Sequence, residues 1–430
     1  MNSEQTNNKS SLPTIIQDLM EANLKNMDLA HNKYWYPLAA PTYGVNEVLQ
    51  AIDSMVTYRT TMWEKTRLFE EMFGARFGGE AVMVNSGSSA DLLMVFALLT
   101  QSGGTLNPGD EVCVPAVTWP THLWSVLMAG LTPVLVDVDP VTLNIDIEDL
   151  KKKITHRTKA IFPVHLMGNP ADMDSINAIA RTNGLYVIED CCESLGAKWN
   201  SQFVGTNSSG GSFSFFFSHH MCTMEGGMIL TRDKDLAERF RLLRAHGWSR
   251  NLRNVDEVFE STNSEYSGLD PRYTFIEWGF NVRPTELQAG FGLEQLTRLD
   301  EFGVQRRRNF ENIHKQLSVI FPEFAFPKVH ENAEPSWFAV PIMIQKNSRF
   351  SRDDLVEYLQ RAGVETRPIV AGNLAKQPVK RRFENIFSGN FPGADLVHNN
   401  GFYIGLHPSA LEGNLDRLVE TFVNFERQLH

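Results

Sequence analysis

Two adjacent histidines, His219 and His220, follow a buried-looking aromatic run and come shortly before a pair of glycines, within "SFSFFFSHHMCTMEGG" (212–227). The interval 199–233 contains no lysine. Because histidine titrates near neutral pH, His219 at the end of a strand could accept and return a proton. A structural, hydrogen-bonded pair is the alternative. A metal site would need further ligands at a suitable spacing, and none is evident, so we expect no metal.

The segment "NSGSSADLL" (85–93) reads as the end of a strand, a turn of small polar residues and the start of a helix. Backbone N–H groups and hydroxyls at a helix start can hold a phosphate. Gly87 would allow close approach of the backbone, and Ser88 would add a hydroxyl. The alternative is an ordinary capped helix after a tight turn.

Acidic residues follow another apolar run in "YVIEDCCESLGA" (186–197). Asp190 or Glu193 could pair with a protonated ring nitrogen of a pyridine cofactor, or could cap the next helix. Trp119, in "PAVTWPTHLWSVLMAG" (115–130), could stack on a planar ring, although a buried core tryptophan is the commoner role. Ser214 and Ser218 stand near the same strand end as His219.

The elements that would position these residues alternate between strands and helices. Apolar runs at 81–84, 112–114, 134–138, 160–164, 185–188 and 228–230 predict strands, with helices at 89–100 and 171–183 between them. This alternation predicts an α/β fold with a mostly parallel sheet, which binds ligands at the carboxyl ends of its strands. A long helical stretch at 285–317 leads into a small C-terminal α/β domain from about residue 320, and the polar stretch 251–272 predicts a surface insertion.

Composition excludes several classes of protein. The 430 residues carry a net charge of −11, which argues against a nucleic-acid binder. The four cysteines form no CxxC pair and indicate a reduced, cytoplasmic protein. The polar N-terminus does not resemble a signal peptide, and the longest apolar run, 92–99, is too short to span a membrane.

In order along the chain, these motifs resemble the DegT/DnrJ/EryC1/StrS aminotransferase family of fold-type I pyridoxal-phosphate (PLP) enzymes. The resemblance rests on "YPLAAPTYG", "NSGSSADLL", "VPAVTW", "PVLVDVD", "TKAIFPVHLMGNP", "IEDCCESLGA", "SFSFFFSHH", "EGGMI", "RAHGW", "GFNVRPTELQAGFGLEQL" and "ETRPIV". It implies an aspartate-aminotransferase-like large domain at 36–319, a small domain at 320–430 and an N-terminal extension at 1–35.

One position departs from the aminotransferases. Where they carry the lysine that holds the cofactor as a Schiff base, this chain has His219, and imidazole cannot form that bond. The substitution resembles the 3-dehydratase branch, which makes 3,6-dideoxysugars for surface polysaccharides from nucleotide-linked 4-keto-6-deoxyhexoses. There, pyridoxamine phosphate (PMP) would condense with the C4 ketone, and His219 would act as the acid and base in removing the C3 hydroxyl.

The branch contains a type that uses a [2Fe–2S] cluster with a partner reductase and a cluster-free type, known from colitose biosynthesis, that uses L-glutamate. A cluster needs about four thiolates, but the segment after "HGW" contains no cysteine up to Phe275. The resemblance therefore favours the cluster-free type, with no reductase partner. A sugar aminotransferase, a [2Fe–2S]-type enzyme and a non-catalytic cofactor- or sugar-binding protein are the alternatives. GDP-4-keto-6-deoxymannose is suggested as substrate, with CDP- or dTDP-linked sugars open.

The resemblance also assigns roles to residues and implies a homodimer with sites at the subunit interface. Arginines are expected to grip the sugar nucleotide or the glutamate carboxylate, since they suit bidentate anion contacts. The expected cofactor contacts are Gly87, Ser88, Trp119, Asp190, Glu193, Ser214 and, from the neighbouring subunit, Asn281; the expected substrate contacts are Arg250, Arg283, His246, Ser218 and Arg367.

Overall fold

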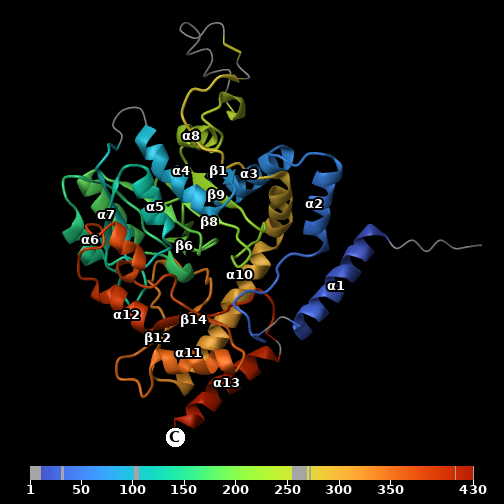
Figure 1. Cartoon of the computed structure of the whole chain (residues 1–430), viewed down its shortest axis with the longest axis vertical. Coiled ribbons are helices and arrows are strands. Elements are labelled where there is room, and N and C mark those ends of the chain that lie inside the picture. The colour runs from blue at the N-terminus through green and yellow to red at the C-terminus, as the bar shows by residue number, and fades with distance from the viewer. Residues whose placement is uncertain are drawn as a thin grey trace, which may run out of the picture.

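The computed structural model describes residues 11–30, 33–100, 106–253, 269–270, 273–411 and 413–429. In Figure 1 a large α/β body lies above a smaller one formed by the C-terminal part of the chain. The 35-residue helix α10 (Glu286–Ile320) runs from the first body towards the second, as predicted for the stretch 285–317. Thr285 caps it in a capping box with Gln288, which satisfies its first N–H groups.

The large body is built on a seven-stranded sheet in the order β1-β9-β8-β5-β4-β2-β3. Strand β9 runs antiparallel to both of its neighbours, and the remaining pairs are parallel. Most strand residues are buried, as expected for a sheet covered on both faces. The strands are β1 (Glu80–Val84), β2 (Glu111–Pro115), β3 (Thr132–Val136), β4 (Thr158–Ile161), β5 (Tyr186–Asp190), β8 (Gly210–Ser214) and β9 (Gly227–Thr231). The predicted α/β class is confirmed.

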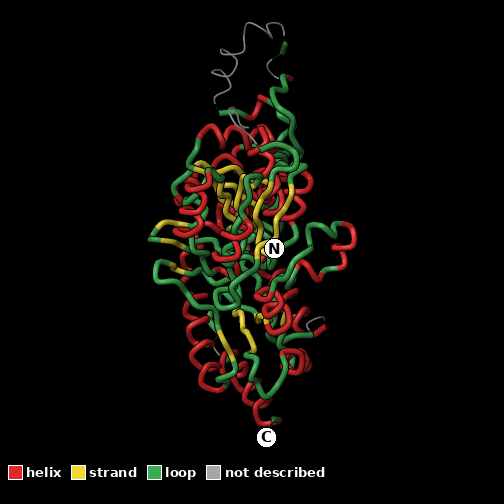
Figure 2. The backbone as a smooth tube through the Cα atoms, turned by 90° about the vertical axis from the view of Figure 1, so that its left-hand side faces the viewer, coloured by secondary structure: helices red, strands yellow, loops and turns green. Residues whose placement is uncertain are grey.

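Helices cover this sheet, and short connections complete the body. Figure 2 shows the strands enclosed between helices in the upper part of the molecule. The helices are α2 (Val45–Val56), α3 (Glu64–Phe77), α4 (Gly87–Thr100), α5 (Thr121–Met128), α6 (Ile147–Lys153), α7 (Met173–Asn183) and α8 (Lys234–Arg244), with short turns η1 (Leu166–Gly168) and η2 (Ser249–Asn251). A three-stranded sheet contains β11 (Ala333–Glu334), β6 (Lys198–Trp199) and β7 (Gln202–Phe203), in that order.

The small body has an antiparallel four-stranded sheet, in the order β10-β12-β14-β13. Its elements are β10 (Phe324–Ala325), β12 (Val340–Ile344), α11 (Arg352–Arg361), β13 (Thr366–Pro368), η4 (Leu374–Lys376), η5 (Pro378–Arg382), α12 (Pro392–Asn400), β14 (Gly401–Ile404) and α13 (Asn414–Gln428). Tyr36 is fully buried in its core and donates its N–H to the Gly363 carbonyl at 3.1 Å. The chain segment that precedes the large body therefore packs on the small body. The predicted domain boundaries at residues 36 and 320 remain a proposal.

The N-terminal helix α1 (Leu12–Ala30) lies beside α2 at the edge of the molecule (Figure 1). It packs through Ile16, whereas Leu12, Ile15 and Leu19 are exposed. Most of the predicted polar insertion, residues 254–268 and 271–272, lies outside the described residues. Among the helices that the structure describes, none is long and apolar enough to cross a membrane.

Candidate active site

A cavity of about 510 Å³ opens at the carboxyl ends of the strands of the large sheet. Residues following β1, β2, β4, β5 and β8 converge there, and the small body closes the cavity with residues around β13 and β14. This is the position at which open α/β sheets bind ligands. Of the residues predicted from the sequence, Gly87, Ser88, Trp119, Asp190, Glu193, Ser214, Ser218, His219 and Arg367 all line this cavity.

Gly87 begins α4 at a point where the backbone passes very close to its neighbours. A Cβ atom there would lie 2.7 Å from Cβ of Ser214 and 2.9 Å from Sγ of Cys192. The Ser86 hydroxyl accepts the N–H of Ser89 at 3.1 Å, which fixes the turn. The start of the helix thus forms a cradle with hydroxyl groups in the cavity lining, and its dipole favours an anion.

Asp190 belongs to a buried charge network that the sequence analysis did not identify. His122 Nε2 lies 2.9 Å from Oδ2 of Asp190, and His122 Nδ1 lies 3.0 Å from the Trp119 carbonyl oxygen. His122 Nδ1 also lies 2.7 Å from the Thr118 hydroxyl, so the protonated imidazole is favoured by the charge of Asp190 and not by these contacts alone. Burial opposes this charge, but the hydrogen bond to Asp190 and its charge raise the pKa of His122 to about 9.

A second carboxyl group, Asp91, joins this network through Ser212. The Ser212 hydroxyl donates to Asp91 Oδ1 at 2.6 Å and lies 3.5 Å from Asp190 Oδ1. Burial and the charge of Asp190 raise the pKa of Asp91 to about 8, so that Asp91 is neutral at pH 7. The partner cation His122 and the N–H of Cys192, at 2.7 Å, keep the pKa of Asp190 below its usual value despite burial. Asp190 is therefore the ionised carboxylate.

Glu193 lies in the cavity wall, three residues after Asp190 in the sequence. Its Oε2 accepts the N–H of Met167 at 2.8 Å. Burial raises the pKa of Glu193 to about 7, an effect that the Met167 hydrogen bond opposes and the Asp190 charge reinforces. The two acidic residues of this motif therefore differ in protonation near neutral pH.

The two histidines of "SHH" have different positions. His219 lines the cavity beside Phe338, and its Nδ1 is buried with no hydrogen-bond partner in the described structure. Burial lowers the pKa of His219 to about 4; the charge of Asp190 opposes this change and that of Arg306 adds to it. His220 is buried, and its Nε2–H donates to the Ser336 carbonyl at 2.9 Å. His219 is thus a neutral imidazole facing the cavity, and His220 is an anchor.

Four predicted residues do not reach this cavity within the chain. His246 and Arg250 are exposed near η2, and Arg250 lies over the Trp248 ring at 5.2 Å. Arg283 Nε donates to Asn281 Oδ1 at 3.0 Å on the surface. Conversely, His122, Asp91, Phe338 and Tyr403 belong to the site or its network and were missed. Only His122, three residues after Trp119, could have been suspected from its position in the sequence.

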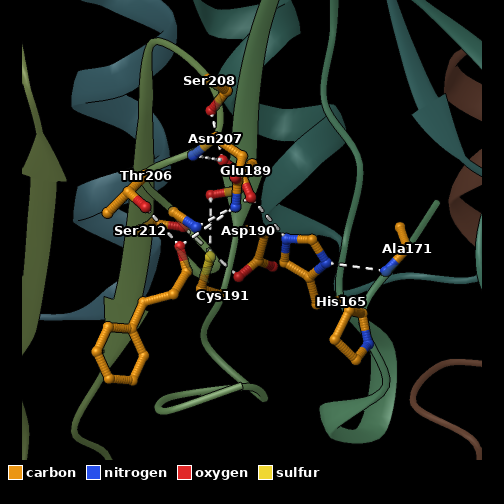
Figure 3. A network of polar contacts seen from close by, with 12 residues as sticks. His165, Ala171, Glu189, Asp190, Cys191, Thr206, Asn207, Ser208 and Ser212 are labelled. Carbon is orange, nitrogen blue, oxygen red and sulfur yellow. Dashed lines mark hydrogen bonds and ion pairs between the residues drawn. The ribbon is translucent and has the colours of Figure 1, made fainter. Parts of the chain in front are cut away.

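Figure 3 shows a further polar network, centred on Glu189 of β5, the residue before Asp190. Glu189 accepts hydrogen bonds from the Gly205 and Asn207 N–H groups and the Ser208 hydroxyl at 2.7–3.1 Å. His165 accepts the Ala171 N–H at Nδ1, so its Nε2–H donates to Glu189 at 2.9 Å. Although His165, Glu189 and Cys191 are close enough to bind a metal, the histidine and the carboxylate already serve this network. Asp91, Asp190 and Cys192 are also close enough to bind a metal, but the two carboxyl groups already contact Ser212 and His122.

The sheet, its ligand cavity and the paired Asp190 define an enzyme of the aspartate-aminotransferase-like PLP fold. An aminotransferase from Psychrobacter cryohalolentis has the same architecture, with a TM-score of 0.82 at 25% identity over 92% of this chain and 100% of that one. The chain belongs to the DegT/DnrJ/EryC1/StrS aminotransferase family, whose model matches residues 43–423. The predicted family and fold are confirmed.

Within the family, the chain is similar to 3-dehydratases. It is 40% identical to the GDP-4-keto-6-deoxy-D-mannose 3-dehydratase of Escherichia coli O55:H7, over 90% of this chain and 98% of the relative. The structure of a GDP-4-keto-6-deoxymannose-3-dehydratase with a trapped PLP–glutamate geminal diamine superposes with a TM-score of 0.80 at 37% identity, covering 90% of this chain and 99% of that one.

Proposed function

We propose that this chain is a PLP/PMP- and L-glutamate-dependent 3-dehydratase that removes the C3 hydroxyl of a nucleotide-linked 4-keto-6-deoxyhexose. The observation that carries the proposal is His219 in the cavity wall, at the position that the family resemblance assigns to the aminotransferase lysine. No lysine is among the described residues that line the cavity. The similarity to 3-dehydratases over nearly their whole length supports the same activity.

The residues of the cavity fit the cofactor. The cradle at Gly87, with Ser88 and Ser214, would hold the phosphate because it offers hydroxyls and a helix start without a Cβ in the way. Trp119 would cover the ring, and ionised Asp190 would hold a proton on the ring nitrogen. When bound, PMP supplies an amine that condenses with the sugar ketone and a ring that accepts electrons.

His219 is suited to moving the proton in this reaction. Its low pKa makes it a neutral base at physiological pH, and without competing hydrogen bonds in the described structure its nitrogens are available. Once protonated in this buried place, it is a stronger acid than an ordinary imidazolium and can donate the proton to the departing C3 hydroxyl. Proton uptake and release by one side chain would thus serve both halves of the elimination.

Glutamate and the sugar nucleotide both bring negative charge to the site. Arg367 lines the cavity, and its Nη2 forms an ion pair with Oε1 of Glu365 at 2.8 Å. The rest of its guanidinium group makes Arg367 our candidate for binding one of these anions. GDP is the proposed nucleotide, following the relatives. We infer that no iron–sulfur cluster or reductase is needed, because no cysteine occurs in 251–272.

We further propose a homodimer in which Asn281, Arg250, Arg283 and His246 act on the cavity of the other subunit. Large apolar side chains are exposed nearby, among them Tyr273, Phe275 and Trp278; the rings of Tyr273 and Phe275 stack on Trp248, over which Arg250 lies. An exposed group of this kind is typical of a subunit interface. The proposed location of the enzyme is the cytoplasm, where nucleotide sugars and glutamate are available.

The test is mass spectrometry of the sugar after incubation with PLP, L-glutamate and GDP-4-keto-6-deoxymannose. The proposal expects a product lacking the C3 hydroxyl, formed together with ammonia and 2-oxoglutarate without a reductase. A product that carries a new amine would mean an aminotransferase. An unchanged sugar with each of the GDP-, CDP- and dTDP-linked substrates would mean a protein that only binds the cofactor or the sugar.

A further inference from the structure

A second cavity, also of about 510 Å³, lies behind the loop that carries the two histidines. Helix α10 forms one wall, the end of α3 another, and the segments around β6 and β11 the rest. Its lining includes Arg76, Lys198, His220, Arg306, Arg307 and Ser336. It is distinct from the proposed active site, with which it shares no lining residue.

Two thin segments of chain separate the cavities. In the first segment, His219 lines the active-site cavity and His220 lines the second cavity. In the other segment, Phe338 lines the active-site cavity and Ser336 lines the second cavity. Arg306 connects the two segments. Its Nη1 donates to the Phe338 carbonyl at 2.9 Å, and its Nη2 lies 3.5 Å from the His219 carbonyl.

The charge of Arg306 is not neutralised by any carboxylate in the described structure. The residue is only 4% exposed, and its Nε has no hydrogen-bond partner among the described residues. Burying a guanidinium without a counter-ion is costly, and burial lowers the pKa of Arg306 to about 10, which still leaves it charged at neutral pH. An anion in the adjoining cavity would relieve this cost.

The other charges around the cavity leave an excess of positive charge. Lys198 forms an ion pair with Glu334 at 3.0 Å, and Arg76 forms one with Asp300 at 2.5 Å. These two acidic residues therefore balance Lys198 and Arg76 and leave the charges of Arg306 and Arg307 without a balancing carboxylate among the described residues of the cavity lining. Arg307, next to Arg306 on α10, is exposed and lines the cavity. The cavity therefore combines one buried and one exposed guanidinium, and guanidinium groups bind oxyanions well.

His220 presents a buried nitrogen, Nδ1, that needs a hydrogen-bond donor from a ligand. Because its Nε2–H donates to Ser336, its Nδ1 carries a lone pair, and this buried atom has no partner among the described residues. Burial lowers the pKa of His220 well below its usual value, so the ring stays neutral and can only accept at Nδ1. A ligand with both negative oxygens and an O–H group would satisfy Arg306 and His220 together.

We propose that this second cavity binds a small protonated oxyanion such as hydrogen phosphate, with Arg306 neutralising its charge and His220 Nδ1 accepting its O–H. The site would reach the catalytic loop directly, since Arg306 holds the His219 carbonyl. An anion on Arg306 would also weaken its repulsion of a protonated His219. The binding itself does not depend on the proposed dehydratase activity.

The experiment is calorimetric titration of inorganic phosphate into the PLP-loaded protein, at constant ionic strength, with the cofactor absorbance followed to verify that no cofactor is displaced. We expect saturable binding of one phosphate per chain. Arg306→Met should weaken it at least about tenfold, and Arg307→Gln about threefold, by loss of charge-assisted hydrogen bonds. Arg308→Gln, which removes an exposed charge from the adjacent position outside the cavity lining, should leave binding unchanged.

Failure of the wild-type protein to bind phosphate would overturn the proposal. Equal losses in Arg307→Gln and Arg308→Gln would also overturn it, because binding would then reflect surface charge in general; this pair decides the matter even if Arg306→Met does not fold. Sulfate carries no proton at neutral pH and should bind several-fold more weakly than phosphate. Equal affinity for the two ions would refute the contact with His220.

Discussion

Nε2 of His122 lies 2.9 Å from Oδ2 of Asp190, and both side chains are almost completely buried. The pair explains how a carboxylate at the bottom of an apolar cavity can remain ionised, because a fixed cation balances the cost of burial. It also places Asp190 so that its charge is available to a ring nitrogen while His122 holds its orientation from behind.

This pair predicts that stability declines in alkaline solution. The pKa of His122 is about 9 in the folded protein and near 6.5 when unfolded, so its contribution is complete below pH 6.5 and is lost as the pH rises through 9. In His122→Gln, the free energy of unfolding should be lower by about 3 kcal/mol at pH 6.5, and its decline between pH 6.5 and 9 should be smaller. Denaturant titrations at several pH values measure both.

The matched control for that experiment is His156→Gln, at an exposed position on the surface. It should reproduce the wild-type dependence on pH. Asp91, whose pKa is raised to about 8, also lowers stability as the pH rises from about 4 to 8. A His122→Gln profile parallel to that of the wild type across pH 6.5–9 would show that His122 is not the protonated partner of Asp190.

The adjacent histidines predict opposite phenotypes. His219→Gln should lower kcat by at least about a hundredfold, since it removes the proton carrier, and should leave the unfolding free energy nearly unchanged. His220→Gln should lose about 1–3 kcal/mol of stability through the buried bond to Ser336, with a much smaller loss of kcat in the folded fraction. Steady-state rates and denaturation curves of both variants provide the test; a His219→Gln enzyme of normal kcat would refute the assigned role.

Much of the fold could be predicted because its signals are local. Apolar runs bounded by polar turns predicted β1, β2 and β5 to within a few residues, and the single long helical stretch predicted α10. The site residues that lie at the ends of strands could also be predicted from the sequence. Gly87, Asp190 and His219 each come immediately after or close to a predicted strand, and parallel strands bring such residues to one edge.

The remainder of the site depends on contacts that no local pattern contains. Arg306 reaches the His219 carbonyl across 87 positions of the sequence, and Asp91 reaches Ser212 across 121. Tyr403 enters the cavity because β14 packs beside β13 in the small body, a pairing set by tertiary structure. The pKa values follow from burial, so a sequence reading could identify Asp190 and Glu193 as acids but not their different protonation.

The cradle at Gly87 predicts a specific loss of cofactor affinity. Gly87→Ala would place a methyl group 2.7 Å from Cβ of Ser214, so either the turn or β8 must move, at a cost of about 1–3 kcal/mol. We expect PLP to bind about tenfold more weakly or worse, as measured by absorbance titration. Gly44→Ala, whose new methyl would have no atom closer than 3.9 Å, is the control and should bind PLP normally. Normal affinity in Gly87→Ala would mean that the phosphate lies elsewhere.

The proposed exchange of residues between subunits predicts complementation. Asn281 and Arg283 lie on the surface and outside the cavity of their own chain, so they can serve a site only if a second copy presents its cavity to them. Asn281→Ala and His219→Gln should each be nearly inactive as pure dimers. When the two are unfolded and refolded together in equal amounts, half of the dimers should be hybrids, and one of the two sites in each hybrid carries no substitution.

The mixture should therefore recover about a quarter of the wild-type rate per chain. A mixture of His219→Gln with Asp190→Asn is the control: both residues line the same cavity within one chain, so every hybrid site has one defect and no activity should return. Recovery in the first mixture alone would place Asn281 in the partner's site. No recovery in either mixture, with dimers present by light scattering, would assign Asn281 to a role within its own subunit and remove the argument for a shared active site.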